Sequence, residues 1–258
     1  MFQLVLLENR MIVLVNRLTP ASGKIRALVM HNRSRSLSTI HGHKLGEILA
    51  LRAVIFDYGM VLTGTPDQEA HDAMVRRTGL PLDRFESLYW KDRHAYDEGK
   101  LTGIEFWQKL LRDADLDLGH GALEELNRLD ARMWTTQNPA MLAWQLRLKE
   151  HGLRTAILSN MGDSVLANIE REFKWINRFD VLVWSYQLRI AKPDPAIYLH
   201  TLEKLDMHPE ETLFLDDRRV NVDAALALGM KSIEFATVER LRSDLIAAGL
   251  DAELPLPA

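Results

Sequence analysis

The chain has 258 residues, of which 47% are hydrophobic and 26% are charged, and its formal net charge is −4. This composition is typical of a globular protein and excludes the disordered and fibrous classes. Because the chain has no cysteine, it has no disulfide, no thiolate metal site and no cysteine nucleophile. No apolar run is as long as a membrane span, so we expect a cytoplasmic protein with no membrane partner.

Residues 1–50 form a basic head with seven Lys or Arg and only two acids, which leaves a charge of −9 on the remaining residues. An acidic main body argues against nucleic acid as a partner, because phosphate binding needs clustered bases. We expect the head to be a loosely ordered extension or a mis-called start. Its Arg and Ser content and few acids also resemble an organelle transit peptide, and this alternative stays open.

Five short apolar runs have the length of buried strands. They are "AVIF" (53–56), "TAILS" (155–159), "DVLVW" (180–184), "TLFLD" (212–216) and "KSIEF" (231–235). Helical patterns of about ten to fifteen residues separate the last four runs. Alternating strands and helices predict an α/β doubly wound parallel sheet, with a core from residues 51–63 and 138–250 and a C-terminal tail at 251–258.

The long interval between the first two strands has no convincing strand pattern and predicts helices after Pro66, after Pro81, from Thr102 and around 121–132. Thr102 and Glu105 form a capping-box pattern. Asn138 followed by Pro139 predicts the start of another helix, which leads into the second strand. The interval therefore predicts an all-helical cap domain at 64–137.

Polar side chains stand where the predicted strands end. Asp57 follows the first strand, Ser159 and Asn160 end the second, the pair Asp216 and Asp217 ends the fourth, and Lys192 stands just before Pro193 and a helix. Each one alone is explained as a turn former or helix cap. In a parallel sheet, however, the carboxyl ends of the strands meet at one edge, where ligands bind.

These groups fit a particular chemistry. An all-oxygen set from Asp57, Asp216 and Asp217 suits Mg²⁺, and a carboxylate beside Mg²⁺ can attack phosphorus to form an aspartyl-phosphate. Lys192 would neutralise charge on the transferring oxygens, while the Ser159 hydroxyl and nearby backbone amides would bind one of them.

In these motifs the chain resembles the haloacid dehalogenase superfamily, in its phosphatase branch with a helical cap inserted after strand one. The motifs occur in the expected order as "FDYGMVL", "AILSN", "AKPDPAIY" and "LFLDDRRVNVDAALALGM". The resemblance implies that Asp57 is the nucleophile and a Mg²⁺ ligand, that Asp217 is the more direct ligand of its pair, and that Asp216 is a ligand or supports one. Asn221 either orients that loop or lies on a helix surface.

Gly59 departs from the family pattern, which has a second aspartate two residues after the nucleophile as acid and base. The backbone carbonyl of Gly59 can still bind the metal, but a proton donor is missing. Three explanations stay open: an acidic leaving group, a donor from the cap, or a water molecule. The cap candidates are His94, Tyr96 and Arg93. His94 is the better acid and base because a histidine titrates near neutral pH, but a helix-surface histidine is the favoured explanation of it.

Other residues near the site have weaker signals. The resemblance implies that Thr63 and Thr65, just after strand one, lie on a mobile loop of the family called the flap, where they would contact phosphate. We expect His94 to contact the substrate. Trp90, Trp107 and Trp134 are interpreted as cap core.

The favoured function is a Mg²⁺-dependent phosphatase acting on a small phosphorylated metabolite, with a sugar phosphate as the first choice. The alternative is a weakly catalytic or non-catalytic protein that binds such a metabolite. A 2-haloacid dehalogenase is less favoured. Halide displacement needs no Mg²⁺, so the pair Asp216 and Asp217, which suits a Mg²⁺ site, argues against this activity. The sequence leaves the substrate and the oligomeric state open.

Overall fold

The computed structural model describes residues 2–7, 10–15, 27–29 and 50–258. The three N-terminal segments are strands of one antiparallel sheet in the order β1 (Phe2–Leu7), β2 (Arg10–Val15) and β3 (Ala27–Val29). The other residues of the head, for which we expect a loosely ordered extension or a transit peptide, lie outside the described residues. Within the described ranges, no helix has the length and apolar character needed to cross a membrane.

The core is a five-stranded parallel sheet in the order β6-β5-β4-β7-β8. Its strands begin and end within one residue of the predicted runs: β4 (Ala53–Phe56), β5 (Arg154–Ser159), β6 (Val181–Trp184), β7 (Thr212–Asp216) and β8 (Lys231–Glu234). β4 is central, and its Ile55 lies opposite Ala156 of β5 and Phe214 of β7. This order brings the ends of β4, β5 and β7 side by side.

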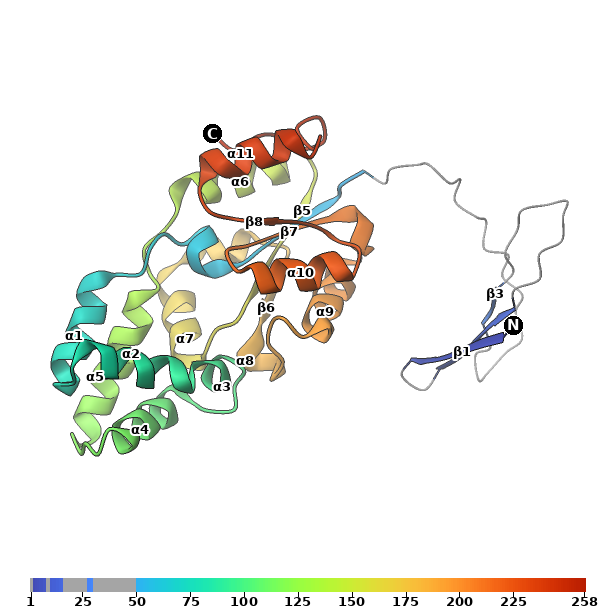
Figure 1. Ribbon diagram of the computed structural model, residues 1–258. Coiled ribbons are helices and arrows are strands. Elements are labelled where there is room, and N and C mark those ends of the chain that lie inside the picture. The colour runs from blue at the N-terminus through green and yellow to red at the C-terminus, as the bar shows by residue number, and fades with distance from the viewer. Residues whose placement is uncertain (1, 8–9, 16–26, 30–49) are drawn as a thin grey trace, which may run out of the picture. The chain divides into compact units, whose positions relative to one another are not determined.

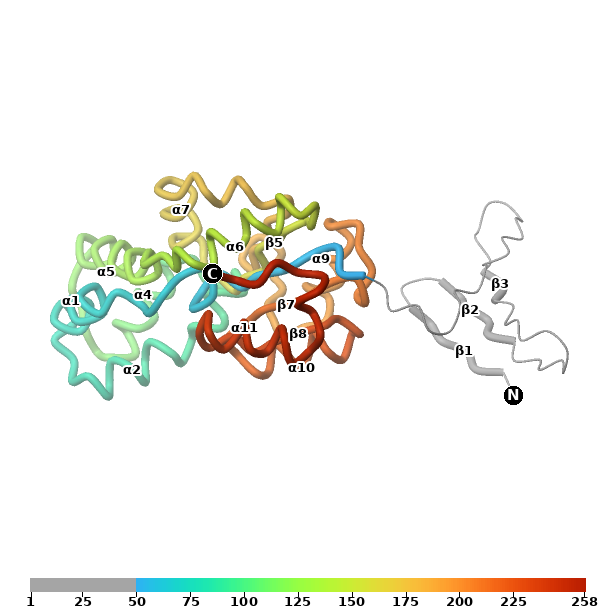
Figure 2. The backbone as a smooth tube through the Cα atoms, turned by 90° about the horizontal axis from the view of Figure 1, so that it is seen from above, coloured from blue at the N-terminus to red at the C-terminus, as the bar shows by residue number. Residues whose placement is uncertain are grey.

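Helices cover both faces of the sheet (Figures 1 and 2). Val54 and Phe56 of β4 point into a hydrophobic cluster with α6 (Pro139–Glu150), α7 (Asp163–Glu172) and α11 (Val238–Ala247). Ala53 and Ile55 point into the opposite cluster, with α9 (Pro195–Leu205) and α10 (Arg219–Ala227). The alternation follows from the period of two along a strand, and it confirms the predicted doubly wound α/β class.

Five α-helices occupy the interval between β4 and α6, and they gather on one side of the sheet (Figure 1). They are α1 (Gln68–Thr78), α2 (Leu82–Lys91), α3 (Arg93–Asp97), α4 (Gly103–Asp113) and α5 (His120–Met133). These helices bury a hydrophobic cluster of their own, which includes Phe85, Phe106 and Trp107. The Thr102 and Glu105 capping box is present at the start of α4. We refer to α1–α5 as the cap, whose exact boundaries remain a prediction.

Short elements complete the core: η1 (Tyr58–Leu62), η2 (Lys174–Arg178), α8 (Ser185–Leu188) and η3 (Pro209–Glu211). Asn138 caps α6 through its side chain, as its sequence position predicts. The segment predicted as a tail packs onto the core, because Leu254 is buried and Trp144 Nε1 of α6 donates to the carbonyl of Pro255.

Candidate active site

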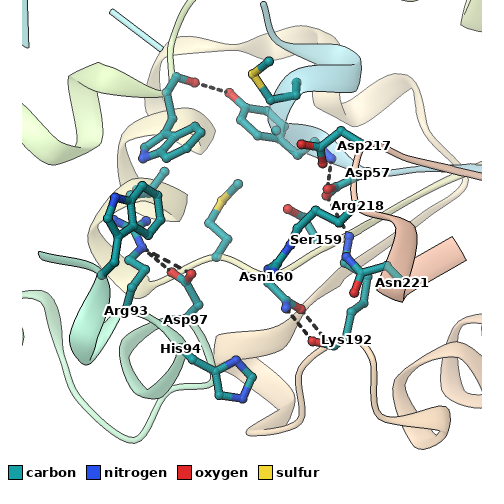
Figure 3. Close-up of a pocket in the computed structure, with 17 residues that line it drawn as sticks. Asp57, Arg93, His94, Asp97, Ser159, Asn160, Lys192, Asp217, Arg218 and Asn221 are labelled. Carbon is teal, nitrogen blue, oxygen red and sulfur yellow. Dashed lines mark hydrogen bonds and ion pairs between the residues drawn. The ribbon is translucent and has the colours of Figure 1, made fainter. Parts of the chain in front are cut away.

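The carboxyl ends of the central strands open into a cavity of about 670 Å³, which the cap also lines. Seven of the predicted site residues line it: Asp57, Gly59, His94, Ser159, Asn160, Lys192 and Asp217. Four of them carry the predicted chemistry, namely Asp57, Ser159, Lys192 and Asp217 (Figure 3). They come from β4, β5, the loop before α9 and the end of β7. The sheet therefore brings together residues that are far apart in the sequence.

Asp57 directly follows β4 and is held by its backbone and by one carboxylate oxygen. Its N–H donates to the Leu215 carbonyl at 2.8 Å, and its Oδ1 accepts the N–H of Tyr58 at 2.7 Å and an ion pair from Lys192. Within the described part of the chain, Oδ2 has no such partner, so this oxygen is the one left for chemistry. Burial raises the pKa of Asp57 to about 7, and the Lys192 charge opposes this rise.

Lys192 is fully buried and makes three contacts through its ammonium group. Its Nζ lies 2.9 Å from Asp57 Oδ1 and 2.6 Å from Asp216 Oδ2, and it donates to the Leu158 carbonyl at 2.9 Å. The two carboxylates raise the pKa of Lys192 against the effect of burial. The lysine therefore stays cationic beside the predicted nucleophile.

Asp216 and Asp217 differ in their environment. Asp216 is fully buried: its Oδ2 pairs with Lys192, and its Oδ1 accepts from Arg218 N and from Asn221 Nδ2, both at 2.9 Å. Asn221 is buried and orients this loop, so the helix-surface alternative for it was wrong. Asp217 is half-buried and lines the cavity, where burial and then Asp216 raise its pKa.

The donor set fits a divalent cation. Asp57, Asp216 and Asp217 each offer an oxygen, and these atoms lie within 4.8 Å of one another. Three carboxylates face the single charge of Lys192, and such clustered negative charge is stabilised by a cation. Oxygen ligands of this kind suit Mg²⁺.

The side chains of two predicted phosphate contacts, Thr63 and Asn160, have hydrogen-bond partners within the protein. The Thr63 hydroxyl accepts from Met60 N and donates to the Tyr58 carbonyl, so Thr63 closes the η1 turn and does not line the cavity. Asn160 Nδ2 donates to the Lys192 carbonyl at 2.9 Å, and Asn160 Oδ1 accepts from Lys192 N at 2.8 Å. Asn160 lines the cavity, but its side chain positions Lys192.

Gly59 lies in the cavity wall with ordinary backbone angles, φ −64° and ψ 136°. A Cβ built at this position would meet Trp134 Cζ3 at 3.8 Å, an ordinary van der Waals distance. The fold therefore does not require glycine here, and the missing carboxylate is a chemical feature of this chain. The left-handed residue of the turn is its neighbour Met60, with φ 60°.

Four residues of the cap line the cavity, namely Trp90, Arg93, His94 and Asp97, and so does Trp134, which directly follows α5. Trp107 is buried in the cap as predicted, whereas Trp90 is 53% exposed and Trp134 lies beside Gly59. The interpretation of Trp90 as cap core was therefore wrong. Trp134 does pack against the hydrophobic cluster of the cap, and it also lines the cavity.

The three predicted cap donors have different surroundings. His94 has a side chain that is 66% exposed, and its Nε2 lies 3.7 Å from Glu98. Tyr96 is fully buried, and burial raises the pKa of its hydroxyl. Arg93 is buried between two carboxylates that hold its pKa high.

Sequence reasoning missed Met60, Asp97, Met161 and Arg218, all of which line the cavity. Arg218 directly follows the aspartate pair, and Met161 follows the Ser159 motif, so adjacency could have indicated both. Asp97 had no such signal, because its place depends on how the cap meets the core.

Comparison with known proteins places the chain among hydrolases. Residues 51–229 match the family model of haloacid dehalogenase-like hydrolases. The chain is 30% identical to Phosphatase MT3486 of Mycobacterium tuberculosis over 71% of this chain and 87% of that protein. It is 28% identical to (S)-2-haloacid dehalogenase 1 of Pseudomonas sp., over 74% and 86% of the two chains.

A solved structure has the same fold at low sequence identity. It is a HAD family enzyme of Bacteroides thetaiotaomicron in complex with magnesium and inorganic phosphate, with a TM-score of 0.59 and 21% identity. The match covers 71% of this chain and 93% of that one.

Proposed function

Because the chain belongs to the haloacid dehalogenase-like hydrolase family, we propose that it is a Mg²⁺-dependent phosphatase of a small phosphorylated metabolite, with sugar phosphates as the first class to test. One observation carries the proposal. The free oxygen of Asp57 stands beside a buried lysine and two further carboxylates, within reach of one cation. A phosphate ester needs this combination of nucleophile and positive charge.

The residues have the following roles. Asp57 Oδ2 attacks phosphorus, the bond to the leaving oxygen breaks, and an aspartyl-phosphate forms; water then hydrolyses it and restores Asp57. Lys192 holds Asp57 Oδ1 in place and offsets negative charge next to the transferred group, and Ser159 binds a phosphate oxygen. Asp57, Asp217 and the Gly59 carbonyl would hold Mg²⁺, supported by Asp216. The ion would supply charge neutralisation for the phosphoryl group.

The test is the Asp57→Asn variant, assayed with Mg²⁺ on a panel of phosphate monoesters. The variant keeps the size of the side chain but not the nucleophilic oxygen, so we expect turnover to fall by at least about a thousandfold, as for loss of other nucleophiles. Activity that survives this substitution would contradict the aspartyl-phosphate mechanism. Circular dichroism of the variant controls for folding.

The same assay separates the alternatives. A protein that only binds phosphorylated metabolites would show saturable binding of inorganic phosphate with Mg²⁺ but no turnover of any ester. Relatives of this chain include a 2-haloacid dehalogenase, and such an activity would release halide from 2-chloropropionate in the presence of EDTA. The pair of buried Asp216 and half-buried Asp217, with its cation-binding geometry, favours the phosphatase.

A further inference from the structure

If the protein itself protonates the leaving group, the donor is a titratable side chain in the cavity other than residue 59, since Gly59 has none. The cavity is lined by these ionisable residues: Asp57, Tyr58, Arg93, His94, Asp97, Lys192, Asp217 and Arg218. Asp57 and Asp217 are assigned to the nucleophile and the metal, and Lys192 is held cationic by its two partners. The Tyr58 hydroxyl donates to the Trp134 carbonyl, and burial raises its pKa. Apart from the arginines, His94 and Asp97 remain.

We propose that Asp97 of the cap is the acid that protonates the leaving oxygen and the base that then activates water. The proposal rests on the phosphatase function above and names the residue that replaces the missing aspartate at position 59. Of the two candidates, His94 lies largely in solvent, whereas the Asp97 side chain is 15% exposed and points into the cavity (Figure 3). A proton donor shielded from bulk water suits this role better.

Asp97 belongs to a buried cluster with more acids than bases. Arg93 Nε donates to both Asp97 oxygens at 3.0 and 3.2 Å, and Arg93 Nη1 donates to Asp130 Oδ1 at 2.8 Å. The Tyr89 hydroxyl donates to the same Asp130 oxygen at 2.6 Å. Two buried carboxylates therefore share one guanidinium, so the cluster favours one bound proton.

Of the two carboxylates that share Arg93, Asp97 lines the cavity and Asp130 does not. Asp130 is fully buried, its Oδ2 has no hydrogen-bond partner among the described residues, and it does not line the cavity. Burial raises the pKa of Asp97 to about 6, with Asp130 adding to the rise and Arg93 and His94 opposing it. Such a carboxyl can both give and take a proton near neutral pH.

Contacts between cap and core fix the position of Asp97. The Ser185 hydroxyl of α8 donates to the Asp97 carbonyl and accepts from Met161 N, just after the Ser159 motif. The Tyr96 ring lies against Gly162, where a Cβ would be only 2.2 Å from the ring. Gly103 N donates to Asp163 at 2.9 Å. The segment around Asp97 is therefore attached to the core next to the phosphate-binding loop.

In the proposed reaction one proton leaves Asp97 in the first step and returns to it in the second. As Asp57 Oδ2 bonds to phosphorus and the ester P–O bond breaks, the Asp97 proton passes to the leaving oxygen and gives an alcohol. The Asp97 carboxylate then takes a proton from water while the water oxygen bonds to phosphorus. The P–O bond to Asp57 breaks, and inorganic phosphate, the Asp57 carboxylate and protonated Asp97 are restored.

The experiment compares two esters in the full-length wild type and in Asp97→Asn, with Mg²⁺. An alkyl phosphate needs protonation of its leaving oxygen, whereas 4-nitrophenyl phosphate releases a stable phenolate. We expect Asp97→Asn to lower kcat/KM for the alkyl phosphate by about a hundredfold or more, in the range of general acid catalysis, and for the nitrophenyl ester by less than about tenfold. Because the pKa of Asp97 is about 6, we also expect alkyl phosphate hydrolysis by the wild type to decline above about pH 6, and this decline should be absent in Asp97→Asn.

Asp130→Asn disturbs the same cluster from a position outside the cavity. Because the Asp130 charge raises the pKa of Asp97, we expect this variant to shift the decline in alkyl phosphate hydrolysis to lower pH. Below that decline, where Asp97 keeps its proton, it should change both esters by the same factor. Equal losses on both esters in Asp97→Asn, or failure of Asp97→Glu to recover alkyl phosphate hydrolysis, would overturn the role of Asp97. Either result would leave the phosphatase function standing. A wild type inactive on both esters would overturn the phosphatase function, and the role of Asp97 with it.

Discussion

Gly59 has room for a side chain and backbone angles that any residue adopts. The Gly59→Asp variant should therefore fold, and its carboxylate would stand in the cavity wall beside Asp57. Since Asp97 already provides the proton in our proposal, we expect Gly59→Asp to change alkyl phosphate hydrolysis by less than about threefold in the wild type. In an Asp97→Asn background, Gly59→Asp should raise the rate of alkyl phosphate hydrolysis by at least about tenfold over Asp97→Asn alone, which is within the contribution of one general acid.

Steady-state kinetics of the two single variants and the double variant measure this coupling. Gly59→Ala is the control for the added Cβ, because it introduces no ionisable group. A large gain from Gly59→Asp in the wild type would show that no other acid is at work.

The residues that follow strands could be predicted, because a strand end is fixed by the apolar run before it. This holds for Asp57, Ser159 and Asp217, which all line the cavity. The role of Thr63 could not be predicted, because its hydroxyl bonds to the backbone of a turn and lies outside the cavity. Asn160 lines the cavity, and its bonds to the Lys192 backbone were not predicted either. Asp97 could not be predicted, because its position depends on contacts between the cap and the core.

Among the helices, the contact between the cap and α7 depends on glycine. Gly162 precedes α7, and a Cβ there would overlap the Tyr96 ring. We expect Gly162→Ala to displace the segment containing Asp97, and to lower the free energy of unfolding by about 1–3 kcal/mol, as for overpacked sites. It should also lower turnover of alkyl phosphates more than that of 4-nitrophenyl phosphate.

Gly121→Ala is the matched control, because Gly121 lies in cap helix α5 with nothing within 4 Å of its Cβ position. Alanine in a helix is favoured over glycine by about 0.5–1 kcal/mol, so this variant should be slightly more stable and equally active. Urea denaturation of both variants measures the difference. A Gly162→Ala protein as stable as the wild type would show that Tyr96 can move at no cost.

The regular elements were the most predictable part of the fold. All five core strands lie where the apolar runs predicted them, because buried parallel strands have near-continuous apolar sequence. Helix α3 was not predicted: it has five residues, and its N-terminus has no side-chain cap. The C-terminal segment was predicted as a tail. Its Leu254 side chain is buried, but three of its contacts use backbone carbonyls of residues 255–257, which leave no pattern in the side chains.

For the whole molecule, the cation site links stability to pH. The pKa of Asp57 is about 7 in the fold against an ordinary value of 3.8, so the folded state binds a proton that the unfolded chain releases. The stability from this proton is complete below about pH 4 and is lost as the pH rises through 7. Mg²⁺ competes with the proton, so the Tm increase caused by Mg²⁺ should be small near pH 5 and larger near pH 8.

Thermal unfolding with Mg²⁺ and with EDTA at each pH measures this effect. Ligand at a hundred times its Kd stabilises a fold by about 2.7 kcal/mol, which sets the scale expected at the higher pH. Asp57→Asn should weaken the pH dependence, because the titrating group is removed. A Tm increase independent of pH would show that the cation binds away from Asp57.

The strand order has a consequence for how the protein is made. β4 is the first core strand to leave the ribosome, yet it becomes the centre of the sheet, and its neighbour β7 is synthesised more than 150 residues later. Until β7 emerges, one edge of β4 has no partner strand, and Asp57 lacks the neighbouring Asp216. The nascent chain therefore cannot assemble its catalytic centre until nearly the whole core has been translated, and a ribosome stalled before residue 212 would hold an inactive, edge-exposed intermediate.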